Sequence, residues 1–299
     1  MLEKSNFKEA SWLRWSAKTK EDAKICIMGV PFDNAVSLNK GAAKAPEHIR
    51  TMSVDLSDTT DEFITIRDDV LYDAGDIHPV LDWEKYFGEV EESALELMNT
   101  GNFCLFIGGD HSVTIPLHKA FKRYHGDKKI GIIHFDAHYD LCPEYDGHIW
   151  SHACTEARAL EGVVKGEDLS FVGVRVAEES ELELMKEHPG ILTIRAADVY
   201  DMGPDKVVEQ LIARYSGYDA IYLTLDIDAL DPAYAPGTGT PVSGGLNPIE
   251  LTKIFRGLLR ALPIRAMDIV EVAPPLDVND VTTWAAMKVI HELFSHYSK

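Results

Sequence analysis

Short apolar runs alternate along the chain with segments in which apolar residues recur at helical spacing. The runs are rich in β-branched and aromatic residues and show little polar alternation, which is typical of strands covered on both faces. They predict strands over residues 25–30, 103–107, 130–135, 171–174, 191–194, 221–225 and 266–270.

Helices are indicated by apolar residues that recur every three or four positions. This spacing predicts helices over 86–98, 207–215, 251–259 and 284–296. The third opens with Asn247 as N-cap, Pro248 at the first helical position and Glu250 placed for a capping box. Because strands and helices alternate throughout, we expect an α/β fold with a largely parallel sheet. No repeat or long linker divides the chain, so a single domain over residues 1–299 is predicted.

The charge balance narrows the classes of partner. The 299 residues include 29 Lys and Arg against 49 Asp and Glu, which gives a formal net charge of −20. Such a field repels phosphate backbones and anionic membranes, so neither nucleic acid nor a membrane is expected as a partner. It favours metal ions or small cationic molecules. The first residues lack the apolar core of a signal peptide. No run reaches the roughly 18 apolar residues of a membrane span. The four cysteines form no CxxC pair. A reduced, cytoplasmic protein is predicted.

Three of the predicted strands are followed by side chains that can bind metal ions. In α/β sheets, the loops beyond the carboxyl ends of the strands carry the chemistry. Alternate side chains of an extended segment point to the same face, so the acidic and imidazole groups after residue 135 should converge, as should those after residue 225. The paired glycines Gly108 and Gly109, which precede His111 after the strand at 103–107, would permit a tight turn. The candidate ligands are His111, Asp136, His138, Asp140, Asp226 and Asp228.

Each of these signals has an ordinary explanation when taken alone. A pair of aspartates after a strand is usually a turn or a helix cap, and a histidine after Gly-Gly-Asp is usually a hydrogen-bonded loop residue. Their coincidence at three strand ends favours a metal site. Oxygen and imidazole ligands without thiolate suit Mn²⁺, with Zn²⁺ or Fe²⁺ as alternatives. Six ligands are too many for one tetrahedral zinc and fit two metal ions. His134 lies within its strand and is expected to be a hydrogen-bonded core residue, whereas Asp110 is expected to orient a ligand or cap a helix.

Three sequence motifs resemble a known family. Gly108-Gly109-Asp110-His111-Ser112, Asp136-Ala137-His138-Tyr139-Asp140 and Asp226-Ile227-Asp228-Ala229-Leu230-Asp231-Pro232 resemble the signature motifs of the ureohydrolases, which include arginase, agmatinase and formimidoylglutamase. The segments 235–241 and 271–275 look most like those of agmatinases. The resemblance extends from about residue 24 to the carboxyl terminus. By contrast, neither a Gly-x-Ser-x-Gly elbow nor a nucleotide-binding glycine motif is present.

The resemblance implies a three-layer α/β/α fold and two Mn²⁺ ions per subunit. In the family pattern, both ions share the carboxylates that correspond to Asp136 and Asp226. A hydroxide between the ions attacks the guanidinium carbon, and the products are urea and an amine. The first ion would be held by His111, Asp136, Asp140 and Asp226, and the second by Asp136, His138, Asp226 and Asp228.

Three residues receive catalytic or substrate-binding roles from the same resemblance. Asp140 would accept the proton of the hydroxide and pass it to the leaving amine. Glu271 would pair with the guanidinium group. His152 would shuttle protons or contact the substrate, and the nearby His148 is an alternative for that role, because the residues around His152 depart from the usual family pattern.

The substrate is expected to be agmatine, which yields putrescine for polyamine biosynthesis. Acidic residues after the second motif, Glu144 and Asp146, would repel the α-carboxylate of arginine and attract a bare ammonium group. Tyr139, in place of a smaller residue, would shorten the pocket. Guanidinobutyrate, guanidinopropionate, arginine and formimidoylglutamate stay open as substrates, as does a non-catalytic binding relative. The resemblance further implies a homo-oligomer, either a trimer or a hexamer.

Overall fold

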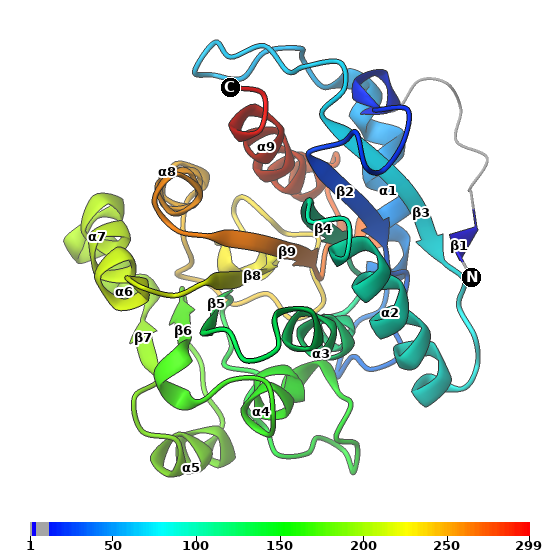
Figure 1. The fold of residues 1–299 in the computed structure, drawn as a ribbon. Coiled ribbons are helices and arrows are strands. Elements are labelled where there is room, and N and C mark those ends of the chain that lie inside the picture. Colours follow the sequence, from blue (N-terminus) through cyan, green and yellow to red (C-terminus); the bar gives the residue numbers. More distant parts are fainter. Residues whose placement is uncertain (1, 4–11) are drawn as a thin grey trace.

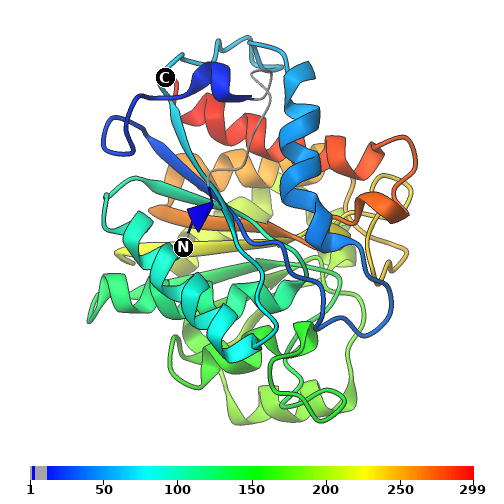
Figure 2. The ribbon, with the colours of Figure 1, turned by 90° about the vertical axis from the view of Figure 1, so that its right-hand side faces the viewer.

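One nine-stranded sheet forms the centre of the computed structural model, which describes residues 2–3 and 12–299 (Figures 1 and 2). Eight of its strands are parallel, and the short β1 pairs antiparallel with β3. The prediction of a largely parallel sheet is thus confirmed. From one edge to the other, the strands are β1 (Leu2–Glu3), β3 (Leu71–Ile77), β2 (Ile25–Gly29), β4 (Phe103–Ile107), β9 (Ile264–Val270), β8 (Ala220–Asp226), β5 (Ile130–Phe135), β6 (Leu169–Val172) and β7 (Leu192–Ile194).

Helices cover both faces of the sheet, and each layer has its own hydrophobic core (Figure 1). The first layer contains α1 (Ala45–Met52), α6 (Ala196–Met202), α7 (Pro204–Tyr215), α8 (Pro248–Ala261) and α9 (Val281–His296). The second contains α2 (Trp83–Met98), α3 (Thr114–His125), α4 (Thr155–Leu160) and α5 (Glu179–Glu187). The three-layer α/β/α architecture is therefore confirmed. Among the described helices, none is both long enough and apolar enough to span a bilayer.

All seven predicted strands are present, but β3 was not predicted. Its sequence contains Asp73 and Asp76, which interrupt the apolar pattern of a buried strand. The guanidinium of Arg50, buried in α1, pairs with both carboxylates, and its Nε lies 2.8 Å from Asp73 Oδ2. Burial of these acidic groups is offset by that cation, which comes from a distant part of the chain.

The capping residues predicted at the start of α8 are confirmed. The side chain of Asn247 accepts hydrogen bonds from the N–H groups of Ile249 and Glu250 at 2.9 Å each. The Glu250 carboxylate in turn accepts the Asn247 N–H at 2.9 Å, which completes the predicted capping box.

The strand register brings the chemistry to one edge of the sheet. β4, β9, β8 and β5 are consecutive neighbours, and their carboxyl ends point the same way. Phe135 pairs with Leu225, so the next residues of β5 and β8, Asp136 and Asp226, lie at the same level. Asp226 is also paired with Val270 of β9, which directly precedes Glu271.

The paired glycines after β4 allow close packing where the chain bends at residues 109–110. Neither glycine has a positive φ angle. A Cβ atom on Gly109 would lie 1.7 Å from the carbonyl oxygen of Phe32, and one on Gly108 would lie 2.6 Å from the Val270 side chain. Because these two glycines have no side chains, the segment around Phe32 can cross the end of β4 next to the residues that follow this strand.

Candidate metal centre and substrate pocket

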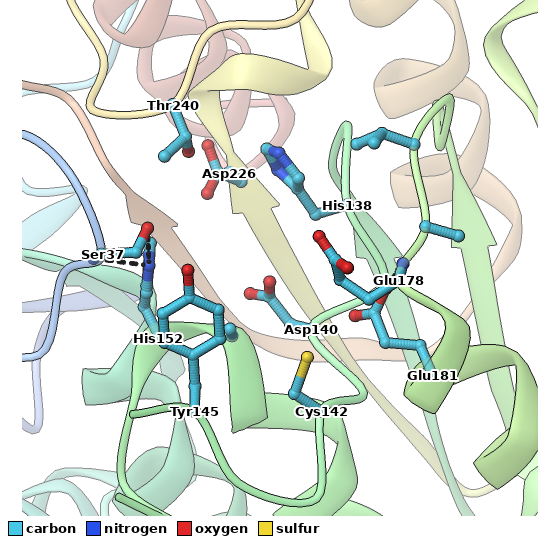
Figure 3. A pocket seen from close by; sticks show the side chains of 13 residues that line it. Ser37, His138, Asp140, Cys142, Tyr145, His152, Glu178, Glu181, Asp226 and Thr240 are labelled. Atoms are coloured by element: carbon cyan, nitrogen blue, oxygen red, sulfur yellow. Dashed lines mark hydrogen bonds between the residues drawn. The ribbon is translucent and has the colours of Figure 1, made fainter. Parts of the chain in front are cut away.

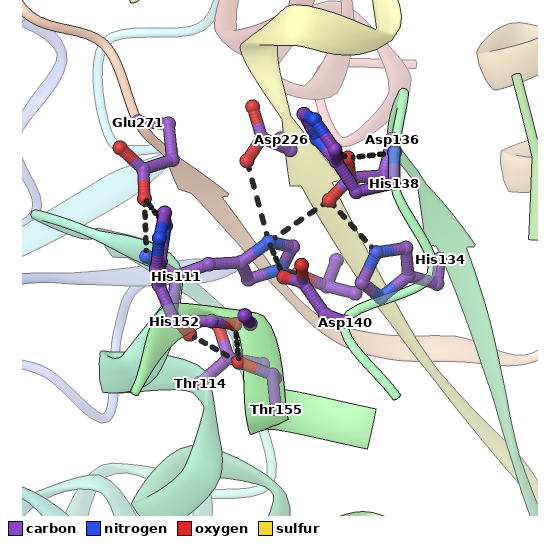
Figure 4. A network of polar contacts seen from close by, with 12 residues as sticks. His111, Thr114, His134, Asp136, His138, Asp140, His152, Thr155, Asp226 and Glu271 are labelled. Carbon is purple, nitrogen blue, oxygen red and sulfur yellow. Dashed lines mark hydrogen bonds and ion pairs between the residues drawn. The ribbon is translucent and has the colours of Figure 1, made fainter. Parts of the chain in front are cut away.

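The six predicted ligands lie together in one cluster at the carboxyl ends of the strands (Figure 4). In its first half, the Nδ1 atom of His111 faces three carboxylates. It lies 3.1 Å from Asp136 Oδ2, 3.0 Å from Asp140 Oδ2 and 3.3 Å from Asp226 Oδ2. These are the donors that the family resemblance places around one metal ion.

The second half of the cluster is built around His138. Its Nδ1 atom lies 3.1 Å from Asp136 Oδ1 and 3.2 Å from Asp228 Oδ2. Asp136 therefore directs one carboxylate oxygen to each half. A carboxylate in this position can bridge two metal ions.

Unsatisfied polar atoms show that the cluster fits divalent cations. The buried His111 Nδ1 and Asp228 Oδ2 make no hydrogen bond of regular geometry among the described residues, although groups that can carry the opposite charge lie 3.0–3.3 Å from them. A bound cation would give both atoms a direct partner. The donor set of oxygens and imidazole nitrogens, without a thiolate, suits Mn²⁺.

The charged groups of the cluster shift one another's pKa strongly when no cation lies between them. Burial, together with the negative charges of Asp228 and Asp136, raises the pKa of Asp226 well above its ordinary value. For His138, burial opposes the charged form, but the carboxylates of Asp228 and Asp136 dominate and raise its pKa to about 12. Bound protons thus compensate the negative charge of the carboxylates in this cluster, as bound metal ions would.

Short backbone interactions hold the acidic side chains in position. Asp226 Oδ1 accepts the N–H of Asp228 at 2.8 Å, and Asp228 Oδ1 accepts the N–H of Ala137 at 3.0 Å. Asp140 has a φ of 52°, in the left-handed region. This conformation turns the chain after β5, and its carbonyl accepts the N–H of Glu156 at 2.9 Å.

A polar chain inside the sheet orients His111. Its Nε2 atom lies 2.8 Å from Thr224 Oγ1, and that hydroxyl donates to Asp268 Oδ1 at 2.6 Å. With Nε2 engaged, Nδ1 is the nitrogen left to face the carboxylates. The sequence analysis missed Thr224 and Asp268, although a polar residue within a buried strand was a usable signal for both.

His134 and Asp110 have the supporting roles that we expected. His134 is fully buried, with Nδ1 2.9 Å from Glu156 Oε1 and Nε2 2.9 Å from Asp136 Oδ2. Although His134 lies within the metal-binding cluster, both ring nitrogens are already paired. Asp110 caps the short helix that carries His111 and also accepts the N–H of Ala35 at 2.9 Å.

His152 and Glu271 form a pair next to the cluster. His152 Nδ1 lies 3.1 Å from Glu271 Oε1, which also accepts the backbone N–H of His111 at 2.9 Å. Burial lowers the pKa of His152, but the hydrogen bond and charge of Glu271 outweigh it and raise the pKa to about 9. Ser37, which the sequence analysis did not single out, donates its N–H to His152 Nε2 at 3.0 Å. Glu271 has a φ of 61°, a strained conformation that turns the chain after β9 at this site.

His148, the alternative to His152, lies outside this arrangement. It is exposed, and its ring centroid is 5.5 Å from that of Trp83. It is not among the residues that line the pocket, whereas His152 is.

A cavity of about 140 Å³ opens over the cluster (Figure 3). Its acidic lining residues are Asp140, Asp226, Glu178 and Glu181, and no Lys or Arg of the described chain lines it. Figure 3 shows the Glu178 carboxylate pointing into the cavity between His138 and Asp140. Glu181 instead accepts the N–H groups of Leu141 and Glu178, at 3.0 and 2.8 Å. The full lining is Ser37, His138, Asp140, Cys142, Tyr145, His152, Ala153, Val176, Ala177, Glu178, Glu181, Asp226 and Thr240.

Two expectations about the pocket were wrong. Glu144 and Asp146 are exposed and do not line it, because the loop after Asp140 directs Cys142 and Tyr145 inward instead. Tyr139 does not shorten the cavity. Its ring packs edge-on to Phe171 at 5.0 Å between centroids and points away from the pocket.

Comparison with known proteins yields consistent relatives. The sequence matches the model of the Arginase family over residues 23–295. It is 38% identical over 277 residues to an agmatinase of Neisseria meningitidis serogroup C. This alignment covers 89% of this chain and 85% of the relative. A solved structure described as a hypothetical agmatinase from Burkholderia thailandensis is 31% identical, with a TM-score of 0.83 over 98% of this chain and 91% of that one. The proclavaminate amidino hydrolase of Streptomyces clavuligerus is 26% identical, with a TM-score of 0.88 over 98% of both chains.

Proposed function

This chain belongs to the arginase family and is an amidinohydrolase, and on that premise we propose that it uses two Mn²⁺ ions to hydrolyse agmatine to putrescine and urea. The observation that carries the proposal is the buried cluster in which Asp136 faces His111 with one carboxylate oxygen and His138 with the other. A non-catalytic relative would be expected to lack a donor or to have a closed pocket. Here the six donors converge beneath an open cavity.

The two ions would be held as the family resemblance implies. Asp136 and Asp226 would contact both, with His111 and Asp140 on one side and His138 and Asp228 on the other. When bound, the ions supply positive charge and lower the pKa of water towards about 7, which provides a nucleophile at neutral pH. Binding of the ions requires His111 and His138 in their neutral forms. These forms are favoured when the positive charge of the ions replaces the charge of the protons in the cluster.

The proposed reaction is the addition of water to the guanidinium carbon, followed by cleavage of its bond to the alkyl nitrogen. Asp140 both faces His111 and lines the cavity, so its carboxylate can take the proton lost by the attacking water. It then returns that proton to the alkyl nitrogen, and the carbon–nitrogen bond breaks. The hydroxyl proton of the intermediate passes to the departing amine, which leaves as the alkylammonium ion, and the remaining carbon becomes the carbonyl carbon of urea.

Glu271 and His152 are proposed to bind and orient the guanidinium group. Glu271 is buried beside His152 and is not itself among the residues that line the cavity. Its Oε1 accepts the His111 N–H and faces His152, and no hydrogen bond among the described residues engages Oε2, so Oε2 could accept an N–H from a guanidinium group that passes the cavity wall. His152 lines the cavity with its ring held between Glu271 and Ser37. From this position it can exchange protons with the substrate or the departing amine.

The charge of the cavity favours agmatine among the open substrates. Arginine, guanidinobutyrate, guanidinopropionate and formimidoylglutamate all carry a carboxylate, and no Lys or Arg of the described lining would pair with it. Beyond the cluster, the Glu178 carboxylate points into the cavity and can attract the primary ammonium group of agmatine (Figure 3). Placing a carboxylate of the substrate beside Glu178 would add like-charge repulsion.

The decisive test is a urea-release assay with purified protein, first stripped with a chelator and then loaded with Mn²⁺. We expect negligible urea from the stripped protein and restored turnover after loading, with agmatine hydrolysed faster than any carboxylate-bearing guanidino compound. Full urea production by verified metal-free protein would refute the two-metal proposal. Preference for a carboxylate-bearing compound would refute only the choice of substrate.

Assembly as a trimer or hexamer and a cytoplasmic location also remain proposals. Family membership supports both, and the four cysteines are all unpaired, as in a reducing compartment. Light scattering coupled to size-exclusion chromatography tests the first, and cell fractionation tests the second.

A further inference from the structure

A second buried polar group lies behind the metal-binding cluster, between the sheet and the helices α3 and α4. Its central residue is Glu156, whose side chain is completely buried in α4. Oε1 of Glu156 lies 2.9 Å from His134 Nδ1. Oε2 has no hydrogen-bond partner among the described residues, and His118 Nδ1 of α3 lies 4.0 Å from it.

Glu156 has no role in the reaction proposed above. It does not line the cavity, and its carboxylate makes no hydrogen bond or ion pair with any of the six candidate ligands, although its backbone N–H donates to the Asp140 carbonyl at 2.9 Å. A buried carboxylate is costly unless its neighbours compensate for it, and apolar side chains would pack in the same place without that cost. Two histidines instead flank it, so the position of Glu156 calls for an explanation beyond packing.

The connection to the metal centre passes through His134. Its ring lies between two carboxylates, with Nδ1 2.9 Å from Glu156 Oε1 and Nε2 2.9 Å from Asp136 Oδ2. Figure 4 shows the contact between His134 and Asp136. The ring also stacks on His111, with centroids 4.7 Å apart. Glu156 therefore anchors the far side of a ring whose near side contacts two residues of the metal-binding cluster.

The orientation of Asp136 is the property that this chain of contacts controls. Its Oδ1 accepts the N–H of His138 at 2.6 Å, and its Oδ2 faces both His134 and His111 Nδ1. Rotation of the carboxylate would move Oδ2 away from the His111 half of the cluster. The hydrogen bond from His134 opposes that rotation, and Glu156 holds His134 in the required orientation.

We propose that Glu156 is a positioning residue which, through His134, sets how tightly the His111 half of the centre holds its metal ion. The inference rests on the proposed function, because it requires a metal ion beside Asp136. Groups that orient metal ligands typically change metal affinity by about 10- to 100-fold when they are removed. The effect should fall on metal binding and leave the Michaelis constant for the substrate unchanged, since Glu156 is absent from the cavity wall.

The test compares Mn²⁺ binding by the full-length protein and by the variants Glu156→Gln and Glu156→Leu. Glutamine keeps the shape and a neutral acceptor for His134, whereas leucine removes the acceptor. We expect one of two Mn²⁺ ions to bind about 10- to 100-fold more weakly in the leucine variant, with a smaller loss in the glutamine variant. Equilibrium dialysis with elemental analysis measures both occupancies without relying on activity.

Kinetics provides the second readout. At limiting Mn²⁺, kcat of the variants should fall, and excess Mn²⁺ should restore it with no change in KM. The isosteric glutamine variant keeps the test valid if the leucine variant does not fold, which circular dichroism will show.

A matched control is Glu292→Gln, which alters another buried carboxylate in the opposite helical layer. Glu292 is 3% exposed and pairs with Arg256 and Lys288, at 2.6 Å each. Its loss should lower the melting temperature and leave both Mn²⁺ affinities unchanged. The inference is overturned if wild-type protein binds two ions and both Glu156 variants bind them equally well. Failure of the proposed function would look different, because wild-type protein itself would then bind no Mn²⁺ or release no urea.

Discussion

Asp136 and Asp226 lie side by side at the ends of neighbouring strands, one residue beyond the paired Phe135 and Leu225. Ninety residues separate the two aspartates along the chain, since 226 − 136 = 90. Both are buried, and both face His111 Nδ1, at 3.1 and 3.3 Å. Two carboxylates in this arrangement repel one another unless protons or cations lie between them.

The variants Asp136→Ala and Asp226→Ala should therefore lose metal and activity together. Each substitution removes a donor to both proposed ions, so the loss of affinity should exceed the roughly 10- to 100-fold typical of residues that only orient ligands. Elemental analysis after dialysis and a urea-release assay measure the two effects. Asp127→Ala, which changes an exposed aspartate, serves as the control. An Asp226→Ala protein with full metal content and normal turnover would contradict the assignment.

Substitution of His152 and substitution of His148 should affect kcat differently. His152→Asn should lower kcat by about 10²- to 10⁴-fold, the usual contribution of a positioned acid–base group, while Mn²⁺ content stays unchanged. His148→Asn should behave like the wild type, because this residue is exposed beside Trp83 and outside the cavity. Steady-state urea release measures both. If the larger loss followed the His148 substitution, the assignment of roles would be reversed.

Glu178 should influence substrate binding rather than chemistry. We expect Glu178→Gln to raise KM for agmatine about 1.4- to 5-fold, since exposed ion pairs contribute about 0.2–1 kcal/mol, and to leave kcat nearly unchanged. The variant should also discriminate less against guanidinobutyrate. Glu179→Gln, an exposed neighbour that does not line the cavity, is the matched control. Equal effects of the two substitutions would indicate a general charge effect instead of a specific contact.

Metal loading should release protons and become tighter as the pH rises. In the metal-free protein burial disfavours the charged form of His138, yet Asp228 and Asp136 raise its pKa to about 12, so the ring is protonated at neutral pH. Binding through Nδ1 requires the neutral ring, and a higher pH lowers the cost of removing that proton. Calorimetric titration with Mn²⁺ in buffers of different ionisation enthalpy measures the number of protons released. An observed enthalpy that is the same in every buffer would contradict this prediction.

The fold class and the donor residues of the cluster could be predicted from the amino-acid sequence. Apolar runs and helical spacing are local properties, so the buried strands and the capped start of α8 could be predicted from neighbouring residues alone. Donor residues placed directly after strands also carried a local signal, since the carboxyl ends of parallel strands meet at one edge. That signal predicts the six candidate ligands that the structure brings together.

Which residues support the cluster and which line the pocket depends on how distant segments pack together. Glu178, Ser37 and Glu156 come from segments whose local pattern shows no chemistry, and they gain roles only through the elements packed against them. β3 was missed for the same reason, because its aspartates become compatible with burial only when Arg50 of α1 pairs with them. Electrostatic interactions inside a protein depend on distance and burial, and neither can be read from separation along the chain.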